Sequence, residues 1–173
     1  MDKITFDEKR IAEGYMNRPW LHKKVIERFV SDCEVTSNFR NGLDVGCGAG
    51  LSTKALHLIC DRVTGTDISE QMIQVCKEEY KDNKAYTFYR AKAEETKAPA
   101  EKYDIVTANI LADVLVPLTP VIVAQMKKGA YYITSGILDV KEDVVVKAVK
   151  DAGLTLVEVT HQGEWVSVTA RKD

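Results

Sequence analysis

A glycine-rich turn constrains this chain more than any other feature. Residues 43–50 read Leu-Asp-Val-Gly-Cys-Gly-Ala-Gly and lie between an apolar run and a helix-forming segment. The glycines at Gly46, Gly48 and Gly50 have no Cβ, so backbone N–H groups can approach a ligand closely and positive φ angles are allowed. A helix that begins near Leu51 would direct its positively polarised amino terminus into the same crevice. The stretch therefore predicts a strand, a tight turn and a helix that together bind a nucleotide-like cofactor.

An acidic residue at the expected distance supports this prediction. The next apolar run ends at Thr66 and Asp67, and Asp67 follows Gly46 by 21 residues. Roughly 20 residues separate the two positions when one helix and one strand lie between them. Because a carboxylate there can accept hydrogen bonds from both hydroxyls of a ribose, we expect Asp67 to bind the sugar of the cofactor.

The rest of the chain alternates between runs rich in β-branched residues and segments of helical period. This alternation is typical of βαβ units, so the predicted fold class is α/β, with a seven-stranded, mostly parallel sheet and helices on both faces. Residues 162–164 separate the last two strands and predict a hairpin, which makes one strand antiparallel. Strands are expected near residues 42–45, 62–66, 85–90, 103–108, 129–135, 155–160 and 166–170, and helices near 51–59, 70–80, 113–125 and 141–151.

Several residues indicate where helices begin and end. Ser69 is expected to cap the second helix, and residues 127–129 (Lys-Lys-Gly) and 151–153 (Asp-Ala-Gly) are typical of helix ends. Pro117 and Pro120 interrupt the helix expected near residues 113–125, which predicts a kink or a late start there.

Composition sets the outer limits. The length of 173 residues suits a single domain, and a formal net charge of −2 provides no general basic field, which argues against nucleic-acid binding. The four cysteines form no C-x-x-C pair, so no metal site is expected. Without a signal-peptide core or an apolar run long enough to span a membrane, we expect a cytoplasmic protein that makes no membrane contact.

The glycine spacing indicates which cofactor is bound. In the dinucleotide pattern a third glycine would stand at Leu51, whereas this chain has G-x-G-x-G preceded by Asp44. It resembles the first motif of class I S-adenosylmethionine (SAM) methyltransferases, which implies a Rossmann-like fold, SAM as cofactor and S-adenosylhomocysteine (SAH) as product. A carboxylate at Asp44 would favour the ammonium group of SAM and repel a pyrophosphate. Cys47, inside the turn, is interpreted as a small apolar filler beside the cofactor.

The amino-terminal part resembles the small-molecule methyltransferases of quinone biosynthesis. The resemblance lies in residues 11–30 and in residues 67–73, which read Asp-Ile-Ser-Glu-Gln-Met-Ile. It implies a helical cover over residues 1–40 and places Ile68 and Met72 beside the cofactor. It also implies that Ala93 and Glu94 flank the adenine, although Lys92 stands where many of these enzymes carry an acid.

From residue 103 onward the resemblance changes. Residues 106–115 (Val-Thr-Ala-Asn-Ile-Leu-Ala-Asp-Val-Leu), 135–138 and 162–166 resemble the catalytic domain of the ribosomal large-subunit protein methyltransferase, without that family's separate amino-terminal recognition domain. This resemblance implies that Asn109 lies beside the transferred methyl group. An amide oxygen there can accept a hydrogen bond from a neutral amine and direct its lone pair at the methyl carbon, so Asn109 is the expected catalytic residue. His22 and Trp165 are expected to be ordinary surface or packing residues.

The two resemblances meet near residues 98–108, which suggests an engineered fusion of two half-domains. The expected function is methyl transfer from SAM to an amine or a small molecule. Two alternatives stay open: a recombined scaffold that binds SAM without efficient turnover, and a nicotinamide-dependent oxidoreductase. The acceptor, whether a ribosomal protein or a small molecule, and the oligomeric state are not predicted.

Overall fold

One mixed sheet of seven strands organises the computed structural model, which describes residues 14, 21–91 and 102–173. The strands lie in the order β3-β2-β1-β4-β5-β7-β6, which confirms the predicted α/β fold with its seven-stranded sheet. Their bounds are Phe39–Val45 (β1), Cys60–Asp67 (β2), Tyr86–Arg90 (β3), Tyr103–Asn109 (β4), Met126–Leu138 (β5), Leu154–Gln162 (β6) and Trp165–Lys172 (β7).

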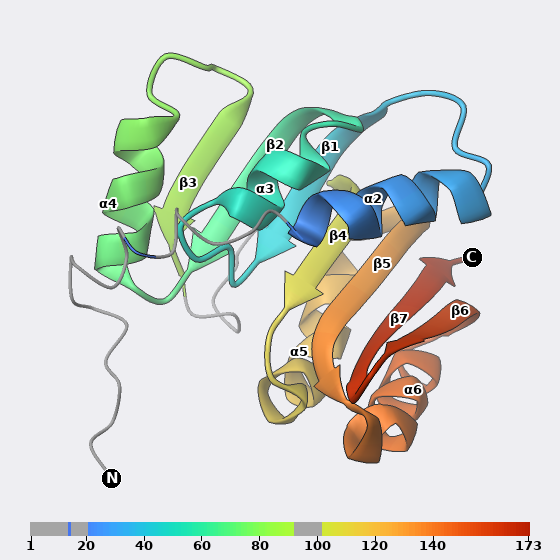
Figure 1. Cartoon of the computed structure of the whole chain (residues 1–173). Coiled ribbons are helices and arrows are strands. Elements are labelled where there is room, and N and C mark those ends of the chain that lie inside the picture. Colours follow the sequence, from blue (N-terminus) through green and yellow to red (C-terminus); the bar gives the residue numbers. More distant parts are fainter. Residues whose placement is uncertain (1–13, 15–20, 92–101) are drawn as a thin grey trace, which may run out of the picture.

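Helices cover both faces of this sheet, as predicted. Helices α2 and α3 pack on one face and α5 and α6 on the other (Figure 1). None of the helices in the described ranges is long and apolar enough to cross a membrane. The helices are α2 (Leu21–Asp32), α3 (Leu51–Leu56), α4 (Glu70–Glu79), α5 (Ala112–Gln125) and α6 (Glu142–Asp151), with a short 3₁₀ turn, η2 (Asp139–Lys141).

Strand directions follow the expected pattern. Strands β1 to β5 pair in parallel, whereas β7 pairs antiparallel with both β5 and β6. Gln162 pairs with Trp165, so only Gly163 and Glu164 form the hairpin turn, and Gly163 has a φ of 61°. Because a tight turn of this kind favours positive φ, glycine fits the position well. The predicted hairpin is confirmed.

Apolar clusters on both faces of the sheet hold the layers together. Leu43 and Val106 pack with Leu115 and Val145 on the side of α5 and α6, whereas Ile26 and neighbouring residues of α2 and α3 pack on the opposite side. In α2, Ile26 and Phe29 are almost fully buried. Helix α2 is the described part of the expected cover over residues 1–40, and it is fixed across the sheet by this burial.

Most of the predicted helix ends are confirmed. Ser69 caps α4, and its hydroxyl oxygen accepts a hydrogen bond from the Met72 N–H at 3.2 Å. Helix α6 ends at Asp151, and Gly153 follows with a φ of 83°. Helix α3 ends at Leu56, earlier than expected, because β2 already begins at Cys60.

Of the kink or late start predicted for α5, the late start is wrong. This helix begins at Ala112, before both Pro117 and Pro120, and includes them. Each proline removes one helical N–H donor. Ala112, Leu115, Leu118 and Ile122 are nevertheless buried along one side of the helix, and this apolar burial outweighs the two lost hydrogen bonds.

The segment Lys127-Lys128-Gly129 does not act as a helix end. Helix α5 stops at Gln125 as predicted, but β5 starts at Met126 and contains all three residues. The pairing shifts between Tyr103 and Ile105, so β5 bulges, and Gly129 adopts a φ of 78° within the bulge. The Lys127 ammonium also contacts the Asp104 carboxylate at 2.7 Å, which ties the bulge to β4.

Replacing Gly42 tests how closely β1 packs against α3. A Cβ at Gly42 would lie 2.8 Å from both the Cys60 sulfur and a Leu56 methyl group. Because overpacking of this kind destabilises a core, Gly42→Ala should lower the free energy of unfolding by about 1–3 kcal/mol in urea denaturation. The matched control is Gly14→Ala, at an exposed position with no atom within 4 Å of the new Cβ. Equal stability of the two variants would contradict this account.

Candidate functional site

The glycine turn leaves β1 and curls over the carboxyl end of β2. The N–H groups of Gly46 and Cys47 both donate to the Thr66 carbonyl, at 2.8 and 2.9 Å. Gly46, Gly48 and Gly50 all have positive φ, at 72°, 51° and 89°. A Cβ at Gly46 would come within 2.4 Å of an Ile110 methyl group. The turn therefore needs glycine both for its backbone conformation and for space, as the sequence predicts.

The Asp67 carboxylate fixes this turn. One of its oxygens accepts the Gly48 N–H at 2.9 Å, and the other accepts the Ser69 N–H at 2.9 Å. A carboxylate has about four acceptor positions, so two remain for other donors. The structure thus brings Asp67 and the glycine turn together, as their spacing in the sequence suggests.

Asp44 lies beneath the turn and is completely buried. One carboxylate oxygen accepts the hydroxyls of Ser52 and Thr53 at 2.6 and 2.7 Å, and the other accepts the Thr107 hydroxyl at 3.0 Å. Burial raises the pKa of Asp44, while the three hydroxyl donors and nearby His22 act in the opposite direction. Asp44 therefore ties α3 and β4 to β1 from below, and its contact with an ammonium group stays a prediction.

Asn109 is exposed at the carboxyl end of β4, next to Ser135 of β5. Its amide nitrogen lies 3.0 Å from Nε2 of His22 on α2. Its oxygen faces Gly136, where a Cβ would come within 2.4 Å of it. Two walls of the site therefore fix the orientation of the amide, and Gly136 leaves room for its oxygen.

His22 is a site residue that sequence reasoning missed. Burial lowers the pKa of this imidazole, with the charge of Asp44 acting in the opposite direction. The neutral ring is therefore favoured, and a neutral ring has one nitrogen that can accept a hydrogen bond. No spacing rule connects residue 22 with residue 109, because only the crossing of α2 over the sheet brings the two together.

A cavity of about 590 Å³ opens between these elements. Its walls include three predicted residues of the glycine turn, Gly46, Cys47 and Gly48, and also Asn109 at the end of the neighbouring strand β4. The remaining lining residues come from the glycine turn, α2, the start of α3, β5 and the ends of β6 and β7: Ala49, His22, Val25, Leu51, Ser52, Ser135, Gly136, Gln162 and Trp165. The cavity thus joins the expected cofactor side to the expected catalytic residue.

Other predicted residues do not line this cavity, Asp44 and Asp67 among them. Gly50 shapes the turn and lies against Tyr80. Met72 is buried, whereas Ile68, directly after Asp67, is 60% exposed. Ala93 and Glu94 lie outside the described residues. Their predicted contacts with a cofactor stay predictions.

Cys47 lies in the cavity wall and is largely buried. Its interaction with Cys76 raises its pKa well above the ordinary value, and burial acts in the same direction. A thiol that stays protonated is a poor nucleophile, which agrees with the interpretation of Cys47 as a filler. Among the described residues, no three histidine, cysteine or acidic side chains gather as a metal site would require.

Trp165 is not the packing residue that the sequence suggests. It is 49% exposed and lines the cavity from the start of β7. A smaller cavity of about 350 Å³ adjoins the first, and the two share Val25, Ser135, Gly136, Gln162 and Trp165. Both run along α2, so this helix forms a common wall.

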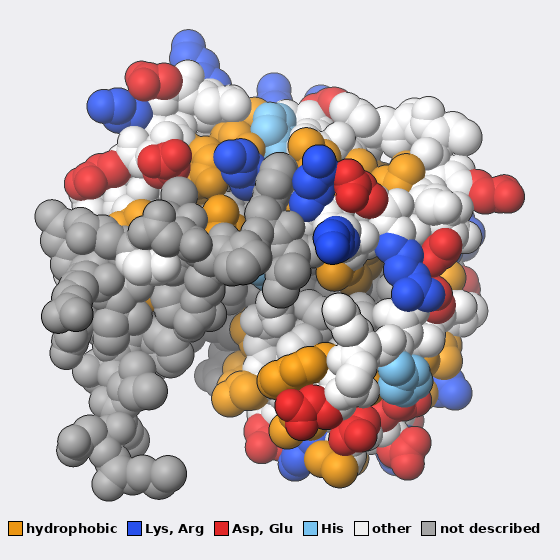
Figure 2. All heavy atoms as spheres, in the orientation of Figure 1, with side chains coloured by type: hydrophobic (Ala, Val, Ile, Leu, Met, Phe, Trp, Pro, Cys, Tyr) orange, Lys and Arg blue, Asp and Glu red, His pale blue; other side chains and the backbone are white. Residues whose placement is uncertain are grey.

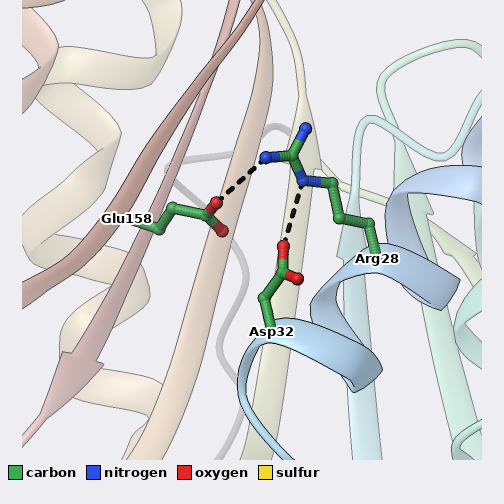
Figure 3. Close-up of polar contacts among 3 residues, drawn as sticks. All are labelled: Arg28, Asp32 and Glu158. Atoms are coloured by element: carbon green, nitrogen blue, oxygen red, sulfur yellow. Dashed lines mark hydrogen bonds and ion pairs between the residues drawn. The ribbon is translucent and has the colours of Figure 1, made fainter.

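An ion pair at the smaller cavity connects α2 to β6. The Arg28 guanidinium contacts Asp32 on its own helix at 3.0 Å and Glu158 of β6 at 3.2 Å (Figure 3). Both carboxylates raise the pKa of Arg28, which therefore stays charged. Helix α2 is thus joined to β4 by the contact of His22 with Asn109, and to β6 by the contact of Arg28 with Glu158.

One family model matches most of the chain. The model described as "Ribosomal protein L11 methyltransferase (PrmA)" covers residues 25–173. The ribosomal protein L11 methyltransferase of Agathobacter rectalis is 47% identical over 140 residues, 75% of this chain and 43% of the relative. The ribosomal protein L11 methyltransferase of Lachnospira eligens is 41% identical over 160 residues, which are 86% of this chain and 48% of that relative. The chain therefore spans about half the length of the curated relatives it matches.

Solved structures show the same fold. A ribosomal protein L11 methylase from Lactobacillus delbrueckii subsp. bulgaricus is 25% identical, with a TM-score of 0.73 over 88% of this chain and 78% of that one. A SAM-dependent methyltransferase from Aquifex aeolicus reaches a TM-score of 0.78 at 16% identity, over 96% and 99% of the two chains. These similarities confirm the Rossmann-like methyltransferase fold.

The single family model crosses residues 98–108 without a break, so nothing supports a fusion of two half-domains at that point. The same family model also covers residues 67–73, where the sequence resembles quinone-biosynthesis enzymes. A nicotinamide-dependent oxidoreductase likewise finds no support. The chain belongs to the ribosomal protein L11 methyltransferase family, whose methyl donor is SAM.

Proposed function

We propose that this chain binds SAM in the 590 Å³ cavity and transfers its methyl group to an amine of ribosomal protein L11. The observation that carries the proposal is that the glycine turn and Asn109, at the ends of the neighbouring strands β1 and β4, line one cavity. The acceptor is the one named for the relatives described above. A small-molecule acceptor has no comparable support.

The donor would lie along the carboxyl ends of β1 and β2. Asp67 has acceptor positions left for the ribose hydroxyls, because its two backbone donors use only part of its capacity. The open backbone of Gly46 and Gly48 would face the methionine part of SAM. The exposed Ile68 follows directly and would offer an apolar surface to the adenine.

Methyl transfer requires positioning more than covalent help. When bound, SAM supplies a methyl carbon already activated by its sulfonium. The amine lone pair forms the new C–N bond as the C–S bond breaks, and the sulfur keeps the electron pair. Asn109 Oδ1 would accept an N–H of the neutral amine and hold its lone pair in line. His22 would keep the amide in this orientation by accepting its N–H.

Removing the Asp67 carboxylate should weaken binding of the donor. Asp67→Ala deletes the ribose acceptors and also releases the Gly48 N–H. We expect the variant to bind SAH more weakly by about 1–3 kcal/mol in calorimetric titration. Asp61→Ala, on the same strand and exposed, is the matched control and should bind as the wild type does. Unchanged affinity of Asp67→Ala would remove the ribose assignment.

Removing the Asn109 amide should affect turnover rather than donor binding. Because the amide positions the amine, Asn109→Ala should lower kcat for methylation of ribosomal protein L11 about 100-fold, with little change in the Kd of SAH. SAH release measures the rate, and Asn83→Ala in the turn before β3 is the control. A normal kcat in Asn109→Ala would rule out its catalytic role. Binding of SAM without SAH release by the wild type would instead favour a scaffold that does not turn over.

A further inference from the structure

Exposed apolar side chains gather where β4 and β5 end. Nine large apolar residues are exposed in the described part of the chain, and six of them lie in this region, including Val140 at 80% and Leu111 at 70%. Figure 2 shows hydrophobic and acidic side chains next to each other over the region where α5 and α6 begin in Figure 1. We call this surface the β4–β5 rim and define it by Leu111, Val114, Leu138, Val140, Val144 and Trp165.

The rim is a fixed surface. Lys141 at the end of η2 contacts Asp113 of α5 at 2.9 Å, which joins the starts of α5 and α6. The Asp139 N–H donates to the Glu164 carbonyl at 2.9 Å, which joins η2 to the β6–β7 hairpin. Leu138 pairs with Trp165 across the sheet. The exposed apolar side chains are therefore held in place by folded elements.

Negative charge surrounds these apolar residues. The segments that carry the rim residues are 111–114, 138–144 and 164–165, and they contain five carboxylates and one lysine. That lysine, Lys141, already contacts Asp113. His161 reaches Glu142 at 2.6 Å. The whole chain carries a net charge of only −2, so the acidity is local. The five carboxylates are those of Asp113, Asp139, Glu142, Asp143 and Glu164.

We propose that the β4–β5 rim docks a basic segment of the protein that carries the methyl-accepting amine. The inference rests on the proposed function and identifies the surface that its acceptor uses. Trp165 belongs to the rim and also lines the cavity, so a chain docked on the rim would reach the site of Asn109. A surface of apolar side chains surrounded by carboxylates is complementary to a protein segment that carries lysines. A small molecule bound inside the cavity would need no such surface.

The opposite side of the cavity fixes the direction of docking. Helix α2 carries Lys23, Lys24 and Arg28, but Lys23 contacts Glu27 and Arg28 contacts Asp32 and Glu158. Lys24 lines the smaller cavity and adds positive charge on this side. A basic segment would therefore be attracted to the α5–α6 side of the opening and would not cross α2.

Two variants of the rim test the proposal. Asp143→Lys combined with Glu164→Lys cancels the net charge of −4 that its five carboxylates and Lys141 give it, and Val140→Ser removes its most exposed apolar side chain. We expect this loss of negative charge to raise the Kd of the SAH-loaded chain for labelled ribosomal protein L11 about tenfold or more at low salt, and less at high salt. Val140→Ser should raise it severalfold. Fluorescence anisotropy measures the Kd without any need for turnover.

Controls of the same chemistry lie away from the rim. Asp61→Lys combined with Asp82→Lys makes the same charge change at exposed positions, and Val157→Ser matches Val140→Ser on β6. Equal effects of rim and control variants, or L11 binding unchanged by the rim variants, would overturn the inference. So would a wild-type chain that does not bind L11, or a dimer in sedimentation that Val140→Ser dissociates.

Failure of the proposed function has a separate readout. If the wild type binds L11 and loses this binding in the rim variants but releases no SAH, the rim stands as a docking surface and the methyl-transfer proposal fails. If SAH is released and the rim variants have the wild-type KM for L11, the reaction stands and the rim inference fails.

Discussion

The contact between the Asp67 carboxylate and the Gly48 N–H is the interaction on which the site depends. It joins the end of β2 to the glycine turn after β1 at 2.9 Å, and the same carboxylate accepts the N–H of Ser69, the residue that caps α4. Three backbone segments thus meet at one side chain. Because the turn has positive φ at each glycine, its conformation needs such an external support, and the same carboxylate keeps acceptor positions for a ligand.

A second carboxylate supports the turn from below. Asp44 is fully buried, and the hydroxyls of Ser52, Thr53 and Thr107 share its two oxygens. A buried carboxylate would be strongly unfavourable without such donors. The two aspartates therefore have different tasks: Asp44 holds the elements together, and Asp67 presents oxygens at the edge of the site.

Local patterns in the sequence predict the strands, the glycine turn, the Ser69 cap and the hairpin, because each depends on neighbouring residues. The bounds expected for α5 are right to within one residue, but the late start expected from its two prolines is wrong, since burial of Leu115 and Ile122 outweighs them. Lys127-Lys128-Gly129 is misread as a helix end because a β-bulge depends on its partner strand. The pairing of His22 with Asn109 and the exposure of Trp165 depend on how α2 and the hairpin meet over the sheet, and no local pattern contains that information.

Backbone amide NMR with added SAH tests the central claim most directly. If SAH binds against the turn that Asp67 supports, the resonances of Gly48 and Ser69 should shift together and saturate at one equivalent, because their N–H groups donate to the carboxylate that would meet the ribose. Saturable shifts confined to β6 and the far end of the sheet, with Gly48 and Ser69 unmoved, would contradict the account.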